Sequence, residues 1–124
     1  MADHPVHYFE IPVLDLDRAV RFYETVFGYD LERAVVDGYE MALFPYVERG
    51  AGASGALAKG DAYVPSRTGA IVYFRVQDID AVVARAVSLG AELVYPKKSI
   101  GAHGYVAEIV DSKGNRIALH AATG

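Results

Sequence analysis

One stretch of the sequence occurs twice in diverged form, and this internal repeat restricts the fold more than any other feature. The first copy is FEIPVLDLDRAVRFYETVFGYDLE and the second is VYFRVQDIDAVVARAVSLGAELV. Each has a short apolar run, two aspartates separated by one residue, and a helical pattern that ends near a glycine. Val13 matches Val76 and Asp15 matches Asp78 at one constant offset. We therefore expect two related halves with the same order of elements.

Each copy predicts a strand followed by a helix. Apolar residues alternate along both strands, at Phe9, Ile11 and Val13 and at Val72, Phe74 and Val76. This alternation gives each strand one apolar face that should pack beneath a helix. The aspartate pairs within residues 15–17 and 78–80 supply a residue that can cap the first helical turn. Gly28 and Gly90 lie where a left-handed residue commonly ends a helix.

Three further strand candidates follow each helix. They are DLERAVV, YEMALFP and SGALAKG in the first half, and AELVYPK, GYVAEIV and NRIALHA in the second. The sequence DSKGN, which separates the last two, predicts a hairpin turn in which Gly114 takes the positive φ. We expect one domain over residues 1–124, with module one at about 5–60, a linker at about 61–68 and module two at about 69–122.

The composition excludes several classes of protein. A chain of 124 residues with 52% apolar residues suffices for one ordinary core. The net charge is −4 without a basic stripe, which argues against nucleic acid and anionic membranes as partners. Cysteine is absent, which excludes disulfides, thiolate zinc sites and cysteine nucleophiles. No apolar run approaches the roughly 18 residues of a membrane span, so we expect a cytoplasmic protein.

The two copies, together with DSKGNRIALH, resemble the vicinal oxygen chelate superfamily, which includes glyoxalase I, bleomycin resistance proteins and extradiol dioxygenases. The resemblance extends from about residue 6 to residue 120. It implies an α+β, glyoxalase-like fold, in which two tandem βαβββ modules form a curled mixed sheet around a central cavity. It also implies a homodimer, because relatives commonly pair. One scaffold carries several reactions and pure binding in this superfamily, so the resemblance does not specify the reaction.

In enzymatic members, the resemblance implies a divalent metal held by His or Glu on the first and fourth strands of each module. The corresponding positions here are Tyr8, Ile71 and Ala118, and the remaining one falls within SGALAKG, which has no acid or histidine. A slip of one residue would put His7 in place of Tyr8, but it would also turn the apolar face of the strand into the cavity. We therefore expect no metal and no other cofactor.

The side chains that alternate with the apolar set should face the cavity. The expected lining comprises Tyr8, Glu10, Met41, Ile71, Tyr73, Arg75, His103, Arg116 and His120. Glu10 is the candidate catalytic residue, because a carboxylate in a partly dry cleft can act as a general base or bind a cationic or hydroxylated ligand. The alternative is a structural ion pair of Glu10 with Arg75 or Arg116.

Three histidines, and the tyrosines as a group, each have a functional and a structural interpretation. His120 is either a proton shuttle or metal ligand beside Glu10, or a solvent-facing or interface residue. His103 lies between glycines, in a loop that either covers the mouth of the cavity or stays on the surface. His4 precedes His7 by three residues but lies near the N-terminus, which argues against a metal pair. The tyrosines either stack on a flat ligand or pack as rim residues.

Three functions follow from these residues. The first is a metal-independent protein that binds a small organic molecule in the cavity. The second is a glyoxalase-like lyase or isomerase, or a dioxygenase, with a metal displaced to Glu10 and His120. The third is an assembly scaffold whose cavity is filled by Tyr8, Tyr73 and Met41. The mixed lining suits sugars, aromatic acids and amines alike, so the sequence does not identify the ligand.

Overall fold

The order of elements is the same in both halves of the chain, as the repeat predicts. The computed structural model describes residues 5–112 and 114–124, so His4 lies outside the described residues. Module one contains β1 (Tyr8–Val13), α1 (Leu16–Phe27), β2 (Glu32–Val36), β3 (Tyr39–Leu43) and β4 (Ser54–Lys59). Module two contains β5 (Val72–Arg75), α2 (Ile79–Ser88), β6 (Glu92–Ser99), a short 3-10 helix (Gly101–His103), β7 (Tyr105–Val110) and β8 (Arg116–Ala121).

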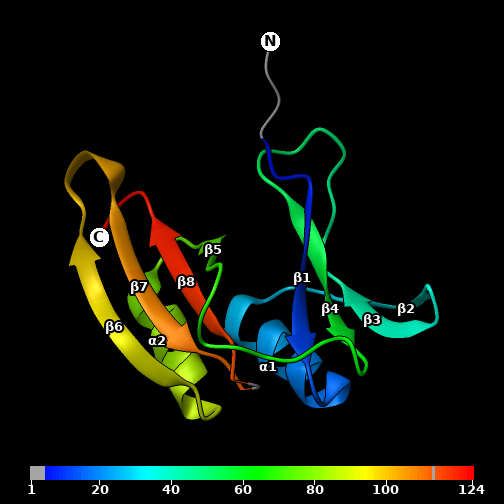
Figure 1. The fold of residues 1–124 in the computed structure, drawn as a ribbon. Helices are drawn as coiled ribbons and strands as arrows, with labels where there is room; N and C mark the ends of the chain where they lie inside the picture. The colour runs from blue at the N-terminus through cyan, green and yellow to red at the C-terminus, as the bar shows by residue number, and fades with distance from the viewer. Residues whose placement is uncertain (1–4, 113) are drawn as a thin grey trace.

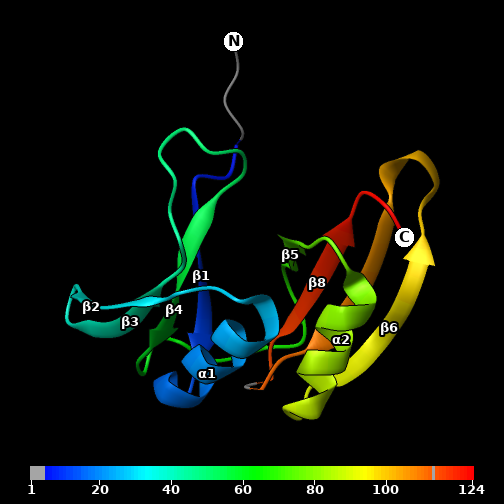
Figure 2. The ribbon, with the colours of Figure 1, turned by 180° about the vertical axis from the view of Figure 1, so that it is seen from behind.

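The strands form two mixed sheets, one in each module. Their orders are β1-β4-β3-β2 and β5-β8-β7-β6. The pairs β1–β4 and β5–β8 are parallel, and all other neighbouring strands in the two sheets are antiparallel. The expected α+β fold is confirmed, but its strands form two four-stranded sheets instead of one continuous sheet. Both helices lie on the same side of the sheets (Figure 2), and we call the opposite side the open face (Figure 1).

The aspartate pairs cap both helices, and in each pair the first aspartate is the cap. The Asp15 carboxylate accepts a hydrogen bond from the amide of Arg18 at 3.1 Å, and Asp78 does the same for Ala81 at 3.1 Å. Gly28 ends α1 in the left-handed region with φ 76°. Neither helix of the described chain has the length and apolar character that a bilayer span requires.

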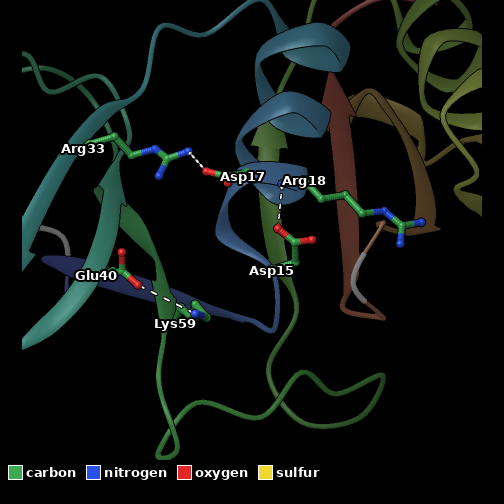
Figure 3. Close-up of polar contacts among 6 residues, drawn as sticks. All are labelled: Asp15, Asp17, Arg18, Arg33, Glu40 and Lys59. Atoms are coloured by element: carbon green, nitrogen blue, oxygen red, sulfur yellow. Dashed lines mark hydrogen bonds and ion pairs between the residues drawn. The ribbon is translucent and has the colours of Figure 1, made fainter.

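The second aspartate of the first pair links the helix to the edge of its own sheet. Asp17 forms an ion pair of 2.5 Å with Arg33 on β2 (Figure 3). A weaker ion pair of 3.7 Å joins Glu40 on β3 to Lys59 on β4. Both pairs are exposed to solvent, so each contributes at most about 1 kcal/mol.

One hydrophobic core extends through both modules. The predicted inward residues Ile11, Val13 and Phe74 are buried in it beneath the helices. Phe74 of module two inserts its ring among aromatic residues of module one, 4.8 Å from the ring of Phe27 and 5.7 Å from that of Phe44. The two modules are therefore held together by aromatic packing and not by backbone pairing between their sheets.

A buried polar network reinforces this contact at the DSKGN turn, where Gly114 has the predicted positive φ of 88°. The hydroxyl of Tyr23 on α1 donates to Asp111 at 2.6 Å. The side-chain amide of Asn115 donates to the carbonyl of Pro12 on β1 at 2.6 Å and accepts from the amide of Ser66 at 3.0 Å. The turn of module two is thus bonded to both module one and the linker.

Candidate functional site

A carboxylate held by two tyrosines is the most distinctive polar group on the open face of module one. Tyr63 donates to one oxygen of Glu10 at 2.7 Å, and Tyr8 donates to the other at 3.0 Å. The hydrogen bond to Glu10, together with partial desolvation, raises the pKa of Tyr63 to about 12. Desolvation and the same carboxylate raise the pKa of Tyr8. Both phenols therefore remain neutral donors over the whole physiological pH range.

Small side chains on the neighbouring strand make room for this cluster. Glu10 on β1 is paired with Ala56 on β4, and Pro12 with Ala58. Both alanines are fully buried together with Met41, under the rings of Tyr39 and Tyr63. These two rings meet edge to face at 5.2 Å, which positions the Tyr63 hydroxyl over β1.

Because the pKa of Tyr63 is raised, its hydrogen bond to Glu10 should contribute to the free energy of unfolding at neutral pH and stop contributing at alkaline pH. An unfolded tyrosine loses its proton near pH 10, whereas folded Tyr63 keeps it up to about pH 12. The bond to Glu10 therefore contributes fully below pH 10 and is lost as pH rises from about 10 to 12. The difference in unfolding free energy between wild type and Tyr63→Phe should shrink across this window, as measured by urea denaturation. A constant difference would contradict the bond.

The open face of module two has a different set of contacts. Arg116 forms its ion pair with Glu108, and its Nε donates to the same carboxylate at 2.6 Å. The predicted ion pair of Glu10 with Arg75 or Arg116 is therefore wrong, since Glu10 binds tyrosines instead. The Nε2 atom of His120 lies 2.6 Å from the carbonyl oxygen of His103. This nitrogen must carry a proton and donate it, because a carbonyl can only accept.

The predicted lining does not surround one cavity. Glu10 and Arg116 line a pocket of about 200 Å³ beside the linker. Tyr73 and Arg75 line another of about 360 Å³ at the seam between the modules. Met41 is buried beneath the open face of module one, Ile71 immediately precedes β5, and His103 is exposed in the 3-10 helix.

The positions that the resemblance assigns to metal ligands do not suit a metal. The hydroxyl of Tyr8 donates its proton in a hydrogen bond to Glu10, and a neutral phenol is a poor metal ligand. Ala118 is fully buried between Tyr73 and Glu108 on the adjacent strands. On β4, Ala56 and Ala58 occupy the open face. Residues 5–112 and 114–124 contain no group of three or more His, Cys, Asp or Glu able to hold a metal ion.

Several residues of these sites have no signal in the sequence. Tyr63 lies in the linker, 53 residues from its partner Glu10, and nothing near it in the sequence indicates that contact. Tyr29 follows α1 and lines the seam pocket together with residues 51–54, which belong to the glycine-rich loop GAGASG before and at the start of β4. A partial signal existed for that loop, since a run of glycines marks a place where backbone approaches a neighbour closely.

One protein-family model matches the chain over both halves of the repeat. Residues 5–119 match the family model described as Glyoxalase/Bleomycin resistance protein/Dioxygenase superfamily. Among curated proteins, the sequence has no match. The match to the family model includes both modules and the linker between them, so it applies to the whole arrangement described above.

Solved structures share the fold at low sequence identity. The fosfomycin resistance protein FosX from Listeria monocytogenes is 22% identical, with a TM-score of 0.72, and the alignment covers 99% of this chain and 94% of that one. A glyoxalase/bleomycin resistance protein/dioxygenase domain from Frankia sp. is 19% identical, with a TM-score of 0.73 and coverage of 98% and 99%. A mutant of the Listeria protein was solved with Mn(II) and 1S,2S-dihydroxypropylphosphonic acid, at 22% identity, a TM-score of 0.71 and coverage of 99% and 95%.

Proposed function

The chain belongs to the glyoxalase/bleomycin resistance protein/dioxygenase superfamily, and from this premise we propose that it binds a small organic molecule without the divalent metal of the enzymatic members. The binding group is the Glu10 carboxylate on the open face of module one. The ligand is an organic molecule with an ammonium or hydroxyl group that donates to this carboxylate. The observation that supports the proposal is the pair of tyrosine hydroxyls that hold Glu10.

The two tyrosines fix the position of the carboxylate without neutralising it. Each oxygen of Glu10 accepts one hydrogen bond from a tyrosine hydroxyl, and each retains a further acceptor site. Hydrogen bonds of this kind to a charged group are stronger than those between neutral groups. The two hydroxyls that bind the carboxylate belong to the aromatic rings of Tyr8 and Tyr63, and aromatic faces attract cations. An arylalkyl ammonium group therefore matches both the charge and the rings.

The metal-dependent alternative has less support from the contacts. Its two ligands lie in different modules, and each is bonded to neighbours of its own: Glu10 to the two tyrosines, and His120 to the carbonyl of His103. The scaffold alternative requires Tyr8 and Tyr73 to fill an interior cavity. These side chains are 47% and 54% exposed, so they are available to a ligand or a partner.

We also propose that two copies of the chain associate through their open faces. Neither helix of residues 5–112 and 114–124 covers these faces (Figure 1), and exposed apolar side chains lie on them, among them Tyr8, Val36, Tyr73 and Tyr95. Association would bury these side chains and bring the open face of one module against that of a partner. Sedimentation equilibrium would measure the mass, and 13.4 kDa at all concentrations would contradict the dimer.

The binding proposal predicts a loss of affinity in Glu10→Gln, which keeps the shape of the side chain and removes its charge. Isothermal titration calorimetry with benzylammonium should show at least about tenfold weaker binding to the variant, because a hydrogen bond to a charged group contributes about 1.5–3 kcal/mol. Benzyl alcohol should bind wild type more weakly than the cation. Addition of EDTA should leave both affinities unchanged, because no metal takes part.

The matched control is Glu40→Gln, which removes an exposed carboxylate from β3 of the same sheet. It should bind benzylammonium as wild type does. Equal binding by wild type and Glu10→Gln would contradict the proposed site. Binding that EDTA abolishes and manganese restores would contradict the metal-independent function.

A further inference from the structure

A second pocket, separate from the Glu10 cluster, opens at the seam between the modules. Its volume is about 360 Å³, which falls within the range of small-molecule sites. One wall is the loop of residues 51–54, which leads into β4, and the other is β5 of module two. Glu10, Tyr8 and Tyr63 are not among its lining residues. Its chemistry is therefore independent of the site proposed above.

The floor of this seam pocket is a continuous aromatic surface. Phe9, Phe44, Phe74 and Tyr29 all line it. Neighbouring ring centroids are close: 5.7 Å from Phe9 to Phe44, 5.7 Å from Phe44 to Phe74, and 5.8 Å from Tyr29 to Phe44. A flat apolar body placed on these rings would gain stacking or edge contacts in addition to its burial. The floor is rigid, because Phe44 and Phe74 are themselves buried in the core.

Arg75, at the end of β5, is the charged residue of the lining. Among the residues that the structure describes, none forms an ion pair or hydrogen bond with its guanidinium. Burial raises the pKa of Tyr29, and the positive charge of Arg75 lowers it. The Tyr29 hydroxyl is therefore close enough to the guanidinium to interact with its charge. The guanidinium therefore lies beside an aromatic floor without an internal counter-ion.

The loop comes close to this guanidinium at Gly52. This residue has a φ of 87°, which favours glycine. A Cβ atom there would lie 3.8 Å from Nη2 of Arg75. The backbone of residues 51–53 thus forms a wall beside the cation.

We propose that the seam pocket binds a small carboxylic acid with an aromatic or other flat apolar body. The carboxylate pairs with the Arg75 guanidinium, and the body lies on the rings of Phe9, Phe44 and Phe74. A guanidinium presents parallel N–H groups that match the two oxygens of a carboxylate. The single positive charge of Arg75 balances the single negative charge of a carboxylate. A phosphate group carries between one and two negative charges at neutral pH, which is more than Arg75 alone balances.

The test is calorimetric titration of the full chain with indole-3-acetate and with its neutral analogue indole-3-acetamide. We expect the acid to bind wild type at least tenfold more tightly than the amide. In Arg75→Gln the affinity for the acid should fall at least tenfold, to the level of the amide. Amide chemical shifts in a ¹H–¹⁵N spectrum should move at residues 51–54 and 72–75 when the acid binds.

The matched control is Arg18→Gln, which removes an exposed arginine from α1 and should leave the affinity for the acid unchanged. Circular dichroism and thermal unfolding of Arg75→Gln establish that the variant folds. Equal affinity for acid and amide would overturn the proposal, as would wild-type affinity in Arg75→Gln. Absence of acid binding to wild type at millimolar concentration would also overturn it. Amide chemical shifts that change only at Tyr8 and Tyr63 would place the ligand at the Glu10 cluster and would also overturn the proposal.

Discussion

Replacement of Phe74 by alanine should lower the free energy of unfolding by about 3–5 kcal/mol, the usual cost of removing a fully packed phenylalanine. The side chain is only 6% exposed. Its ring contacts five others, at Phe9, Tyr23, Phe27, Tyr29 and Phe44. All five belong to module one, so the substitution opens a cavity at the contact between modules. Urea denaturation followed by circular dichroism measures the loss.

The comparison variant for Phe74→Ala is Tyr46→Ala, which removes an aromatic ring that is 72% exposed in the loop after β3. Its unfolding free energy should stay within about 0.5 kcal/mol of wild type. If Phe74→Ala cost no more than Tyr46→Ala, the ring would not form the contact between modules. A steep loss in Phe74→Ala alone would show that aromatic packing stabilises this contact.

Replacement of Asp111 by alanine should cost about 3 kcal/mol of unfolding free energy. Asp111 is 4% exposed, and its carboxylate accepts bonds from the fully buried Tyr23 hydroxyl and from the amide of Asn115. Removal of the carboxylate leaves two buried donors without this acceptor, at about 1–3 kcal/mol each. Chemical denaturation measures the cost directly.

A double-mutant cycle with Tyr23→Phe separates this bond from other effects of Asp111→Ala. The two substitutions should be non-additive by about 1 kcal/mol or more, because they remove the same hydrogen bond. Asp61→Ala, at an exposed aspartate of the linker, should change stability by less than about 0.5 kcal/mol. Strict additivity of Asp111→Ala and Tyr23→Phe would show that the bond contributes nothing.

The repeat predicted the fold because the relevant interactions are local. The caps at Asp15 and Asp78 depend on amides three residues away, and the strands follow from alternation within six residues. The hairpin at Gly114 is equally local. The order of one strand, one helix and three strands in each half also follows from these local patterns, and the structure confirms it.

The candidate site was only partly predictable, because its contacts join residues far apart in the chain. Glu10 was predicted on the open face, but its partner Tyr63 comes from the linker. An ion pair of Glu10 with Arg75 or Arg116 was the alternative prediction, yet the register of β7 and β8 places Glu108 diagonally across from Arg116, and these two form the ion pair. Strand alternation gives the face of a side chain, whereas the partner depends on register and on how the modules pack.

The linker also has a consequence for chimeric proteins in which one module is exchanged for that of a relative. Tyr63 contacts the first module through Glu10, and three residues later Ser66 contacts the second through Asn115. A crossover point anywhere between these two residues keeps each with its own module. A crossover before Tyr63 or after Ser66 separates one of them from its partner. The productive window for recombination is therefore only the three peptide bonds between residues 63 and 66.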